Sequence, residues 1–311
     1  MKKLFIIGNG FDVSHKLPTR YSDFQDYLKE NYPDASEEYL IVPESFTMPD
    51  GDEKYDDDEV VGFLLKIITE TEATGEAWSD LENTLGELDF DECFDNWYAD
   101  DDDDDADDDD NDWNEAYGNE DIASNISGAV RMIKEYFSDW IETIDIYGIE
   151  RKTKFYHLID ENNDLFLTFN YTETLEEIYG AKNVYHIHGK QGGKLVFGHG
   201  NNMDNYDDYM NRNIGSENHL SELQIALKKD TETFINHNKS LFKELGAVDE
   251  IYSYGFSFSD VDMIYIKEIC RLSSTENIVW FIHDYDSDKF DAFKEKINNC
   301  GFKGTVEMFT V

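Results

Sequence analysis

The sequence contains few cysteines, few basic residues and no long apolar run. Its three cysteines, Cys93, Cys270 and Cys300, lie far apart and form no CxxC pair. The spacing therefore favours neither a zinc ribbon nor a disulfide framework. No apolar stretch approaches the roughly 20 residues that a transmembrane helix needs. The N-terminus lacks an apolar segment followed by a small-residue cleavage site, so we expect no signal peptide and a soluble cytoplasmic protein.

Acidic residues far outnumber basic ones. The 311 residues include 70 Asp and Glu but only 26 Lys and Arg, a formal net charge of −44. Because binding nucleic-acid phosphates needs Lys and Arg to displace counterions, this balance disfavours general nucleic-acid binding. An anionic membrane surface is disfavoured for the same reason. Apolar residues make up 40% of the chain, which is enough for the core of one large or two small domains.

The N-terminal segment combines an apolar run with a glycine-rich turn. Residues 4–7 are all apolar, and Gly8-Asn9-Gly10 follows them directly. An unbroken run is typical of a central strand that is covered on both faces of a parallel sheet. Open α/β sheets bind nucleotide phosphates at such strand-to-turn junctions. From this stretch alone, a tight turn without a ligand is an equally good interpretation.

Short apolar runs alternate with helical patterns beyond about residue 160. We predict strands at residues 4–7, 165–169, 184–187, 195–197, 250–254, 278–282 and 305–309. We predict helices at residues 21–31, 60–71, 78–85, 122–146, 172–179, 221–245, 260–272 and 286–299. Strands that alternate with helices indicate a parallel sheet. The sequence therefore predicts an α/β core from residues 1–32 and 160–311, with residues 33–159 as a helical insertion.

An aspartate run lies inside this insertion. Residues 100–112 are aspartate except for Ala106 and Asn111. Adjacent like charges repel and aspartate is a poor helix former, so we predict a disordered segment at about 99–112. Calcium-binding loops need glycine and spaced ligands, which this run lacks. A solvated spacer is therefore favoured over a cation site.

Three further polar loops follow predicted strands. They contain Asn170, the pair His186 and His188, and Gly255 with Ser257. Because the carboxyl ends of parallel strands meet at one edge of a sheet, we expect these loops to join the glycine turn in one ligand site. Each loop alone is weak support, since a single histidine is more often structural and an asparagine before a helix is usually a cap.

A series of short motifs runs along nearly the whole chain. They are Gly8-Asn9-Gly10-Phe11-Asp12, Leu17-Pro18-Thr19, Tyr21-Ser22-Asp23-Phe24, Trp78-Ser79-Asp80-Leu81-Glu82, Phe169-Asn170-Tyr171-Thr172, His186-Ile187-His188-Gly189, Phe197-Gly198-His199-Gly200, Gly255-Phe256-Ser257 and Val261-Asp262. In this order they resemble the AbiH family of bacteriophage abortive infection proteins. Only the acidic segments at 34–59 and 99–112 fall outside the resemblance. It implies an antiphage defence protein, with a phage-encoded trigger protein and a homo-oligomer among its candidate partners.

AbiH proteins in turn resemble distant sirtuin-like NAD-binding proteins. The resemblance implies a Rossmann-like, sirtuin-type fold, with a mostly parallel sheet flanked by helices and a helical insertion. It implies NAD as the ligand or substrate and assigns its contacts to Gly8, Asn9, Gly10, Asp12, Arg20, Gly255 and Ser257. The glycine loop would hold the phosphates, and the Gly255 turn would close on the adenosine side. For Asp12, a cap on the loop amides and a ligand of a ribose hydroxyl both stay open.

The same match implies catalytic roles for Asn170 and His188. Asn170 would orient the ribose or a water molecule, and His188 would be the general base, because a neutral imidazole can take a proton near neutral pH. Thr172 stands where sirtuins have aspartate, and the paired zinc cysteines are absent. We therefore expect no zinc and no protein deacylation. Hydrolysis of the nicotinamide–ribose bond is the implied reaction.

Other interpretations stay open at this stage. The loops could sense a nucleotide without turnover, or the chain could hydrolyse another nucleotide or a nucleic-acid end. In the latter case Asp12, His15, His186 and His199 could hold a metal, although their spacing matches no standard metal motif. The acidic surface could also act as a decoy for basic partners.

Overall fold

The computed structural model describes residues 2–71, 80–98, 108–245, 247–272 and 274–311. The chain divides into two compact units. One, called the sheet unit below, comprises residues 1–20, 141–196 and 229–311. The other, called the helical unit, comprises residues 21–140 and 197–228. These bounds differ from the predicted ones, because residues 21–32 and 197–228 belong to the helical unit and residues 141–159 to the sheet unit.

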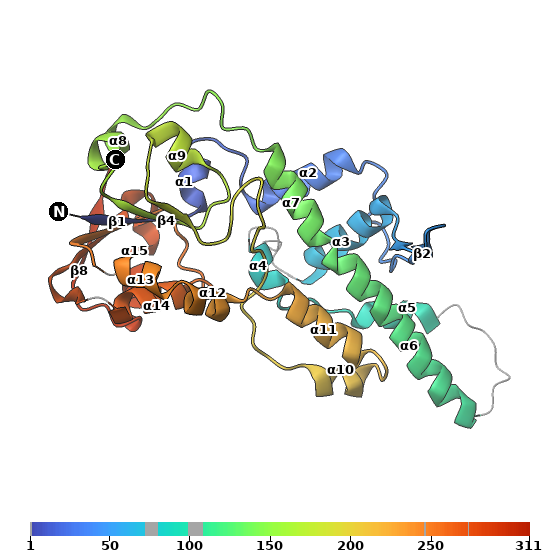
Figure 1. Ribbon diagram of the computed structural model, residues 1–311. Helices are drawn as coiled ribbons and strands as arrows, with labels where there is room; N and C mark the ends of the chain where they lie inside the picture. Colours follow the sequence, from blue (N-terminus) through green and yellow to red (C-terminus); the bar gives the residue numbers. More distant parts are fainter. Residues whose placement is uncertain (1, 72–79, 99–107, 246, 273) are drawn as a thin grey trace. The chain divides into compact units, whose positions relative to one another are not determined.

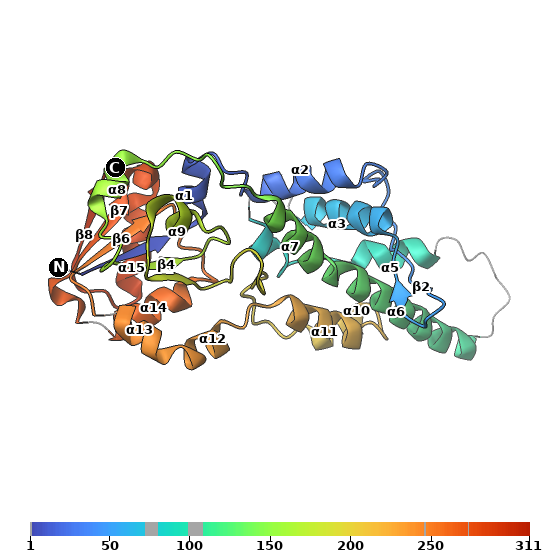
Figure 2. The ribbon, with the colours of Figure 1, turned by 45° about the horizontal axis from the view of Figure 1, so that its top comes forward.

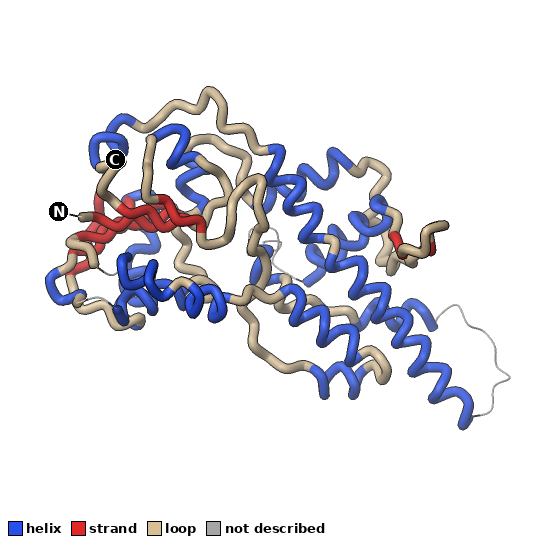
Figure 3. Tube along the Cα trace, viewed as in Figure 1, coloured by secondary structure: helices blue, strands red, loops and turns tan. Residues whose placement is uncertain are grey.

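Six parallel strands form the sheet (Figure 1 and Figure 3). They are β1 (Lys3–Ile7), β4 (Leu165–Thr168), β5 (Val184–His186), β6 (Glu250–Tyr254), β7 (Val279–His283) and β8 (Thr305–Phe309). Their spatial order is β5-β4-β1-β6-β7-β8, and every neighbouring pair is parallel. Chain order therefore reverses at β1, as in Rossmann-type sheets, whose ligands bind at the carboxyl ends of the strands beside this reversal. The predicted Rossmann-like α/β fold is confirmed.

Helices cover both faces of this sheet (Figure 1 and Figure 2). One face carries α1 (Asn9–Ser14), α8 (Thr153–Leu158) and α9 (Thr174–Tyr179), and the other carries α12 (Thr231–His237), α13 (Lys239–Leu245), α14 (Met263–Leu272) and α15 (Phe290–Asn299). Alternate residues of β1 serve the two faces. Phe5 and Ile7 pack toward Phe11, while Leu4 and Ile6 belong to the opposite core. The unbroken apolar run of β1 follows from this double coverage.

The helical unit contains α2 (Tyr21–Asn31), α3 (Asp57–Thr71), α4 (Leu81–Thr84), α5 (Asp91–Tyr98), α6 (Asp108–Arg131), most of α7 (Ile133–Thr143), α10 (Tyr206–Arg212) and α11 (Glu217–Leu227). A short antiparallel pair of strands, β2 (Phe46–Thr47) and β3 (Glu53–Lys54), follows α2 and precedes α3 along the chain. Aromatic side chains build part of its core, with the rings of Phe137 and Phe197 stacked at 4.0 Å. None of the described helices combines the length and apolar character that a membrane crossing requires.

The aspartate run is only partly covered by the described residues. Residues 100–107 lie outside them, but residues 108–112 form the first turn of α6. The disorder predicted at about 99–112 stays a prediction.

Four other predicted elements differ from the structure in extent or type. Residues 195–197 form no strand, because within the described chain no strand of the sheet pairs with them. The helix predicted at 221–245 is divided among α11, α12 and α13, since Asp230 caps a new helix by accepting a hydrogen bond from the Thr233 amide at 3.1 Å. The helix predicted at 122–146 is divided between α6 and α7. The helix predicted at 78–85 is helical over Leu81–Thr84, and residues 78 and 79 lie outside the described residues.

Candidate functional site

The predicted site residues follow four neighbouring strands of the sheet. Gly8 follows β1, Asn170 lies just after β4, His188 lies just after β5 and Gly255 follows β6. In space these strands are consecutive, in the order β5-β4-β1-β6. Because all four are parallel, their carboxyl ends form one edge. The expected gathering of the four loops at one edge is present.

The glycines of the first turn are required by backbone packing. The Gly8 amide donates to Tyr254 O at 3.1 Å and the Gly10 amide to Gly255 O at 2.9 Å. A Cβ atom on Gly8 would lie 2.5 Å from Gly255 O, and Gly255 itself has a φ of +63°. Only glycine tolerates such a close approach and such a conformation. Two amides of the turn therefore face the Gly255 loop instead of an open phosphate site.

Three other predicted NAD contacts lie in different surroundings. The Asn9 side chain donates to Thr19 O at 2.7 Å and so fixes the segment that follows α1. Arg20 and Ser257 are exposed. Asn9 therefore has a structural role, and the side chains of Arg20 and Ser257 lie at the surface.

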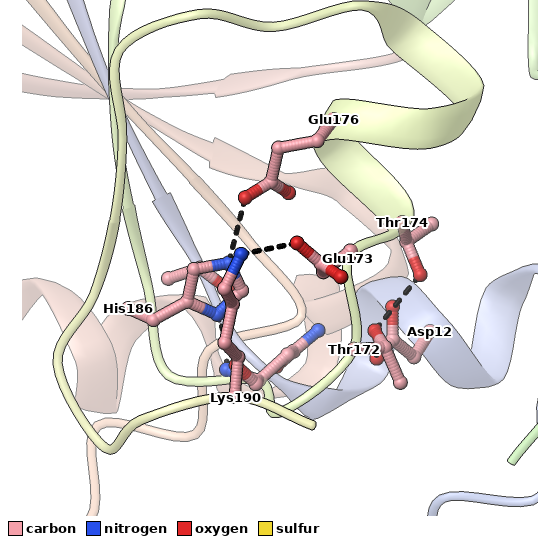
Figure 4. A network of polar contacts seen from close by, with 9 residues as sticks. Asp12, Thr172, Glu173, Thr174, Glu176, His186 and Lys190 are labelled. Carbon is pink, nitrogen blue, oxygen red and sulfur yellow. Dashed lines mark hydrogen bonds and ion pairs between the residues drawn. The ribbon is translucent and has the colours of Figure 1, made fainter. Parts of the chain in front are cut away.

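Asp12 is a buried carboxylate of α1, the helix that follows β1 (Figure 4). Only 1% of the residue is exposed. Its Oδ2 accepts a hydrogen bond from Thr172 Oγ1 at 2.6 Å, and Thr172 Oγ1 is 2.8 Å from Thr174 Oγ1. Its Oδ1 has no hydrogen-bond partner. Burial raises the pKa of Asp12 to about 6, against the opposing effect of the nearby Thr172, Thr174 and Asn170 side chains.

Asn170 lies beside Asp12 and is held through its backbone. Asn170 O contacts His186 Nδ1 at 2.9 Å. His186 Nε2 contacts Glu176 Oε1 at 2.9 Å (Figure 4). Lys190 and Glu173 form an ion pair near these contacts (Figure 4). The Asn170 Oδ1 atom is buried and has no hydrogen-bond partner. Asp12 and Asn170 thus present two acceptor oxygens without donors, while His186 has a structural role.

His188 faces a second aspartate, Asp262. His188 Nε2 lies 3.2 Å from Asp262 Oδ1, and the same oxygen lies 3.6 Å from Lys229 Nζ. Ser259 donates to the other carboxylate oxygen at 3.2 Å. The His188–Asp262 contact has ion-pair distance, but its angles do not meet those of a hydrogen bond. The contact between His188 and Asp262 is therefore an ion-pair contact.

Aromatic rings enclose the His188 imidazole. The ring of Phe169 lies edge-on at 5.3 Å, and the rings of Tyr265 and Tyr171 lie at 6.1 and 6.3 Å. Only 3% of His188 is exposed. These contacts restrict the orientation of the imidazole and exclude bulk water from it.

The other histidines considered as metal ligands have structural partners. His15 contacts Phe11 O at 2.8 Å and the Tyr179 hydroxyl at 2.6 Å, and burial lowers its pKa. His199, in the helical unit, contacts Gln224 O at 3.1 Å, and its Nδ1 accepts from the Asn201 amide at 3.1 Å. Within the described ranges, no group of three or more His, Cys, Asp or Glu side chains is arranged to hold a metal ion.

The family model for bacteriophage abortive infection AbiH matches residues 4–284 of this chain. The chain belongs to the AbiH family. Asp12, Asn170, His188 and Asp262 all lie within the matched residues, so the buried polar groups at the sheet edge are part of the AbiH region. This AbiH protein is therefore a bacteriophage abortive infection protein. No curated protein and no solved structure matches this chain.

Sequence reasoning missed two members of this AbiH site. Asp262 was named in the sequence only as part of the Val261-Asp262 motif, with no role assigned to it. Lys229 was not predicted as a site residue. The motif position of Asp262, seven residues after Gly255, was a usable signal. Lys229 gave none, because Lys228-Lys229-Asp230 reads like any exposed charged segment.

Proposed function

We propose that this AbiH protein binds NAD or a related nucleotide at the carboxyl edge of its sheet and hydrolyses the nicotinamide–ribose bond. Depletion of NAD in an infected host would account for abortive infection, with a phage-encoded protein as the trigger. The observation that carries the proposal is the pair of buried, unpartnered oxygens, Asp12 Oδ1 and Asn170 Oδ1.

These two oxygens favour a ligand that donates hydrogen bonds. A buried acceptor left without a donor costs about 1–3 kcal/mol, so each of these oxygens favours a partner that donates. The hydroxyl groups of a ribose are donors, and they would satisfy both Asp12 and Asn170. A phosphate group, which only accepts when ionised, would not. The phosphates would instead use Arg20 or Ser257, which are exposed, since the Gly8 and Gly10 amides already have partners.

The carboxylate of Asp12 compensates for a difference from sirtuins. Sirtuins have aspartate where this chain has Thr172, and Thr172 Oγ1 donates directly to Asp12 Oδ2 at 2.6 Å. The negative charge that sirtuins carry at this strand end is thus supplied here from α1. Above its pKa of about 6, the ionised Asp12 would stabilise the positive charge that develops on the ribose during cleavage.

His188 is suited to the proton transfer in this reaction. Water attacks the anomeric carbon of the ribose, the carbon–nitrogen bond breaks, and its electron pair leaves with nicotinamide. The proton that the attacking water loses passes to the imidazole of His188. Asp262, 3.2 Å from His188 Nε2, stabilises the imidazolium that forms, and Asn170 orients the ribose.

Release of nicotinamide tests this proposal. Purified protein is incubated with NAD, with and without lysate of phage-infected cells, and nicotinamide is quantified by chromatography. We expect release by the wild type and by His157→Ala, an exposed histidine of α8 that serves as control. We expect loss of release in His188→Ala and Asn170→Ala. Absence of release under every condition, or full activity of His188→Ala, would refute hydrolysis at this site.

A nucleotide sensor without turnover is the second candidate. The burial of His188, with 3% of the residue exposed, favours it, since a general base must reach its substrate. Calorimetry that shows saturable NAD binding, together with unchanged NAD after incubation, would support the sensor over the hydrolase.

A further inference from the structure

Lys229 is a charged side chain in the interior of the sheet unit. Its side chain has an exposed fraction of 0%. It lies between α11 and α12, directly after Lys228, whose side chain is exposed. Burying an ammonium group costs several kcal/mol unless an opposite charge is close. A lysine held at such a position therefore indicates a specific electrostatic role.

Asp262, an acidic partner of Lys229, also contacts His188. Asp262 Oδ1 lies 3.6 Å from Lys229 Nζ and 3.2 Å from His188 Nε2. A single carboxylate oxygen thus faces one permanent cation and one imidazole. If the imidazole took a proton, two positive charges would face the same carboxylate oxygen in a medium of low dielectric constant. Repulsion from the ammonium therefore opposes the charged form of His188.

Among the described residues, aromatic rings and a hydroxyl group surround the His188–Asp262 pair. Tyr265 of α14 and Tyr171 after β4 contribute rings at 6.1 and 6.3 Å, and Phe169 contributes a third ring at 5.3 Å. Ser259 donates to Asp262 Oδ2. Neutral phenols and a hydroxyl group do not compensate for the loss of a full positive charge.

We infer that Lys229 is a positioning residue that neutralises Asp262 and thereby keeps His188 uncharged, the state in which it can accept a proton. Only the catalytic importance of an uncharged His188 rests on the proposed function. The charge arrangement itself does not depend on any substrate.

The titration of Asp262 agrees with this assignment. Burial alone would raise its pKa, but the Lys229 ammonium, followed by His188, lowers it to about 2. Lys229 thus stabilises the carboxylate more than His188 does. Asp262 stays ionised at every pH at which the protein would act.

The test measures the protonation of His188 by NMR of the ring nitrogens in the full chain without ligand. The variants are Lys229→Met and the more conservative Lys229→Gln, with Lys228→Met as the matched control. Assignment of the His188 signals comes from their loss in His188→Asn. We expect an uncharged imidazole at pH 7.5 in the wild type and in Lys228→Met. In Lys229→Met and Lys229→Gln we expect the imidazolium form.

A second substitution keeps the test decisive. In Lys229→Met/Asp262→Asn both charges are absent, and His188 should be uncharged again. This double variant also removes the buried charge that could prevent folding of the single variants. An uncharged His188 in Lys229→Met and Lys229→Gln would overturn the inference, as would an imidazolium in the wild type or in the double variant.

The result separates this inference from the proposed function. A protein that releases no nicotinamide but shows the expected change of His188 protonation refutes hydrolysis and supports the role of Lys229. If NAD is hydrolysed, Lys229→Gln should lose activity near neutral pH and regain it at higher pH, where the imidazolium loses its proton.

Discussion

The two buried aspartates of the site should respond in opposite ways to removal of their charge. Asp12 and Asp262 are both less than one-tenth exposed, yet burial raises the pKa of Asp12 to about 6. Burial would also raise the pKa of Asp262, but Lys229 and His188 lower it to about 2. An unfolded aspartate has a pKa near 3.8. The signs of the two differences determine the predictions.

Asp12→Asn should stabilise the protein at neutral pH. Protonated Asp12 contributes stability that is fully present below its unfolded pKa and lost as the pH rises through about 6. The shift corresponds to a penalty of about 3 kcal/mol for the ionised form. The variant avoids this penalty, so we expect a gain of up to about 3 kcal/mol at pH 7.5 that disappears toward pH 4.

Asp262→Asn should destabilise the protein, with a different pH dependence. Because its pKa is lowered, ionised Asp262 contributes about 2–3 kcal/mol to the free energy of unfolding. This contribution is present above the unfolded pKa and is lost only as the pH falls toward about 2. The variant also removes the carboxylate 3.6 Å from the buried Lys229 ammonium. The loss should therefore be at least about 2 kcal/mol and constant between about pH 4.5 and 7.5.

Urea unfolding followed by circular dichroism, at several pH values between about 4.5 and 7.5, measures both effects. The slopes of the transitions must agree between variants for the free energies to be compared. An Asp12→Asn variant that is no more stable than the wild type at pH 7.5, or a gain that does not change with pH, would refute the assigned environment of Asp12.

Three further predictions concern packing and reactivity. Gly8→Ala should destabilise the protein by about 1–3 kcal/mol through overpacking against the Gly255 loop, whereas Gly193→Ala, whose nearest atom is 3.2 Å away in an exposed loop, should change the unfolding free energy little. Thr172→Val removes the hydrogen bond to Asp12 and should cost about 1–3 kcal/mol at pH 7.5, with a smaller loss near pH 4.5, where Asp12 is protonated. Burial raises the pKa of Cys93 to about 12, so alkylation by iodoacetamide should be slow in the native protein and fast after unfolding, as mass spectrometry would show.

The arrangement of the sheet was predictable because it depends on simple periodicity. The apolar run at residues 4–7 and the alternation of strands and helices after residue 160 follow directly from burial on two faces. The strand predicted at residues 195–197 was wrong, because three apolar residues in a row do not reveal whether a neighbouring strand is available to pair with them. The single helix predicted at residues 221–245 was wrong, because its apolar spacing continues across Asp230. In the structure, the hydrogen bond that the Thr233 amide donates to Asp230 starts a new helix there.

The site was predictable to the level of loops, but not of contacts. Asn170 and His188 could be placed at strand ends from the sequence, since each follows an apolar run. The glycines, in contrast, suggested a phosphate loop, whereas in the structure the Gly10 amide donates to Gly255 O and the Gly8 amide donates to Tyr254 O. The grouping of His188, Asp262 and Lys229 depends on residues far apart in the chain, and no local pattern could have indicated it.

Binding of NAD to wild type and Asp12→Asn tests the central claim most directly. The variant is expected to be folded and more stable at neutral pH, so a loss of binding cannot be attributed to unfolding. Calorimetry should show saturable binding of NAD to the wild type and to Gly193→Ala, and little or none to Asp12→Asn. No binding by the wild type, or equal binding by Asp12→Asn, would contradict a nucleotide site built on the Asp12 and Asn170 oxygens.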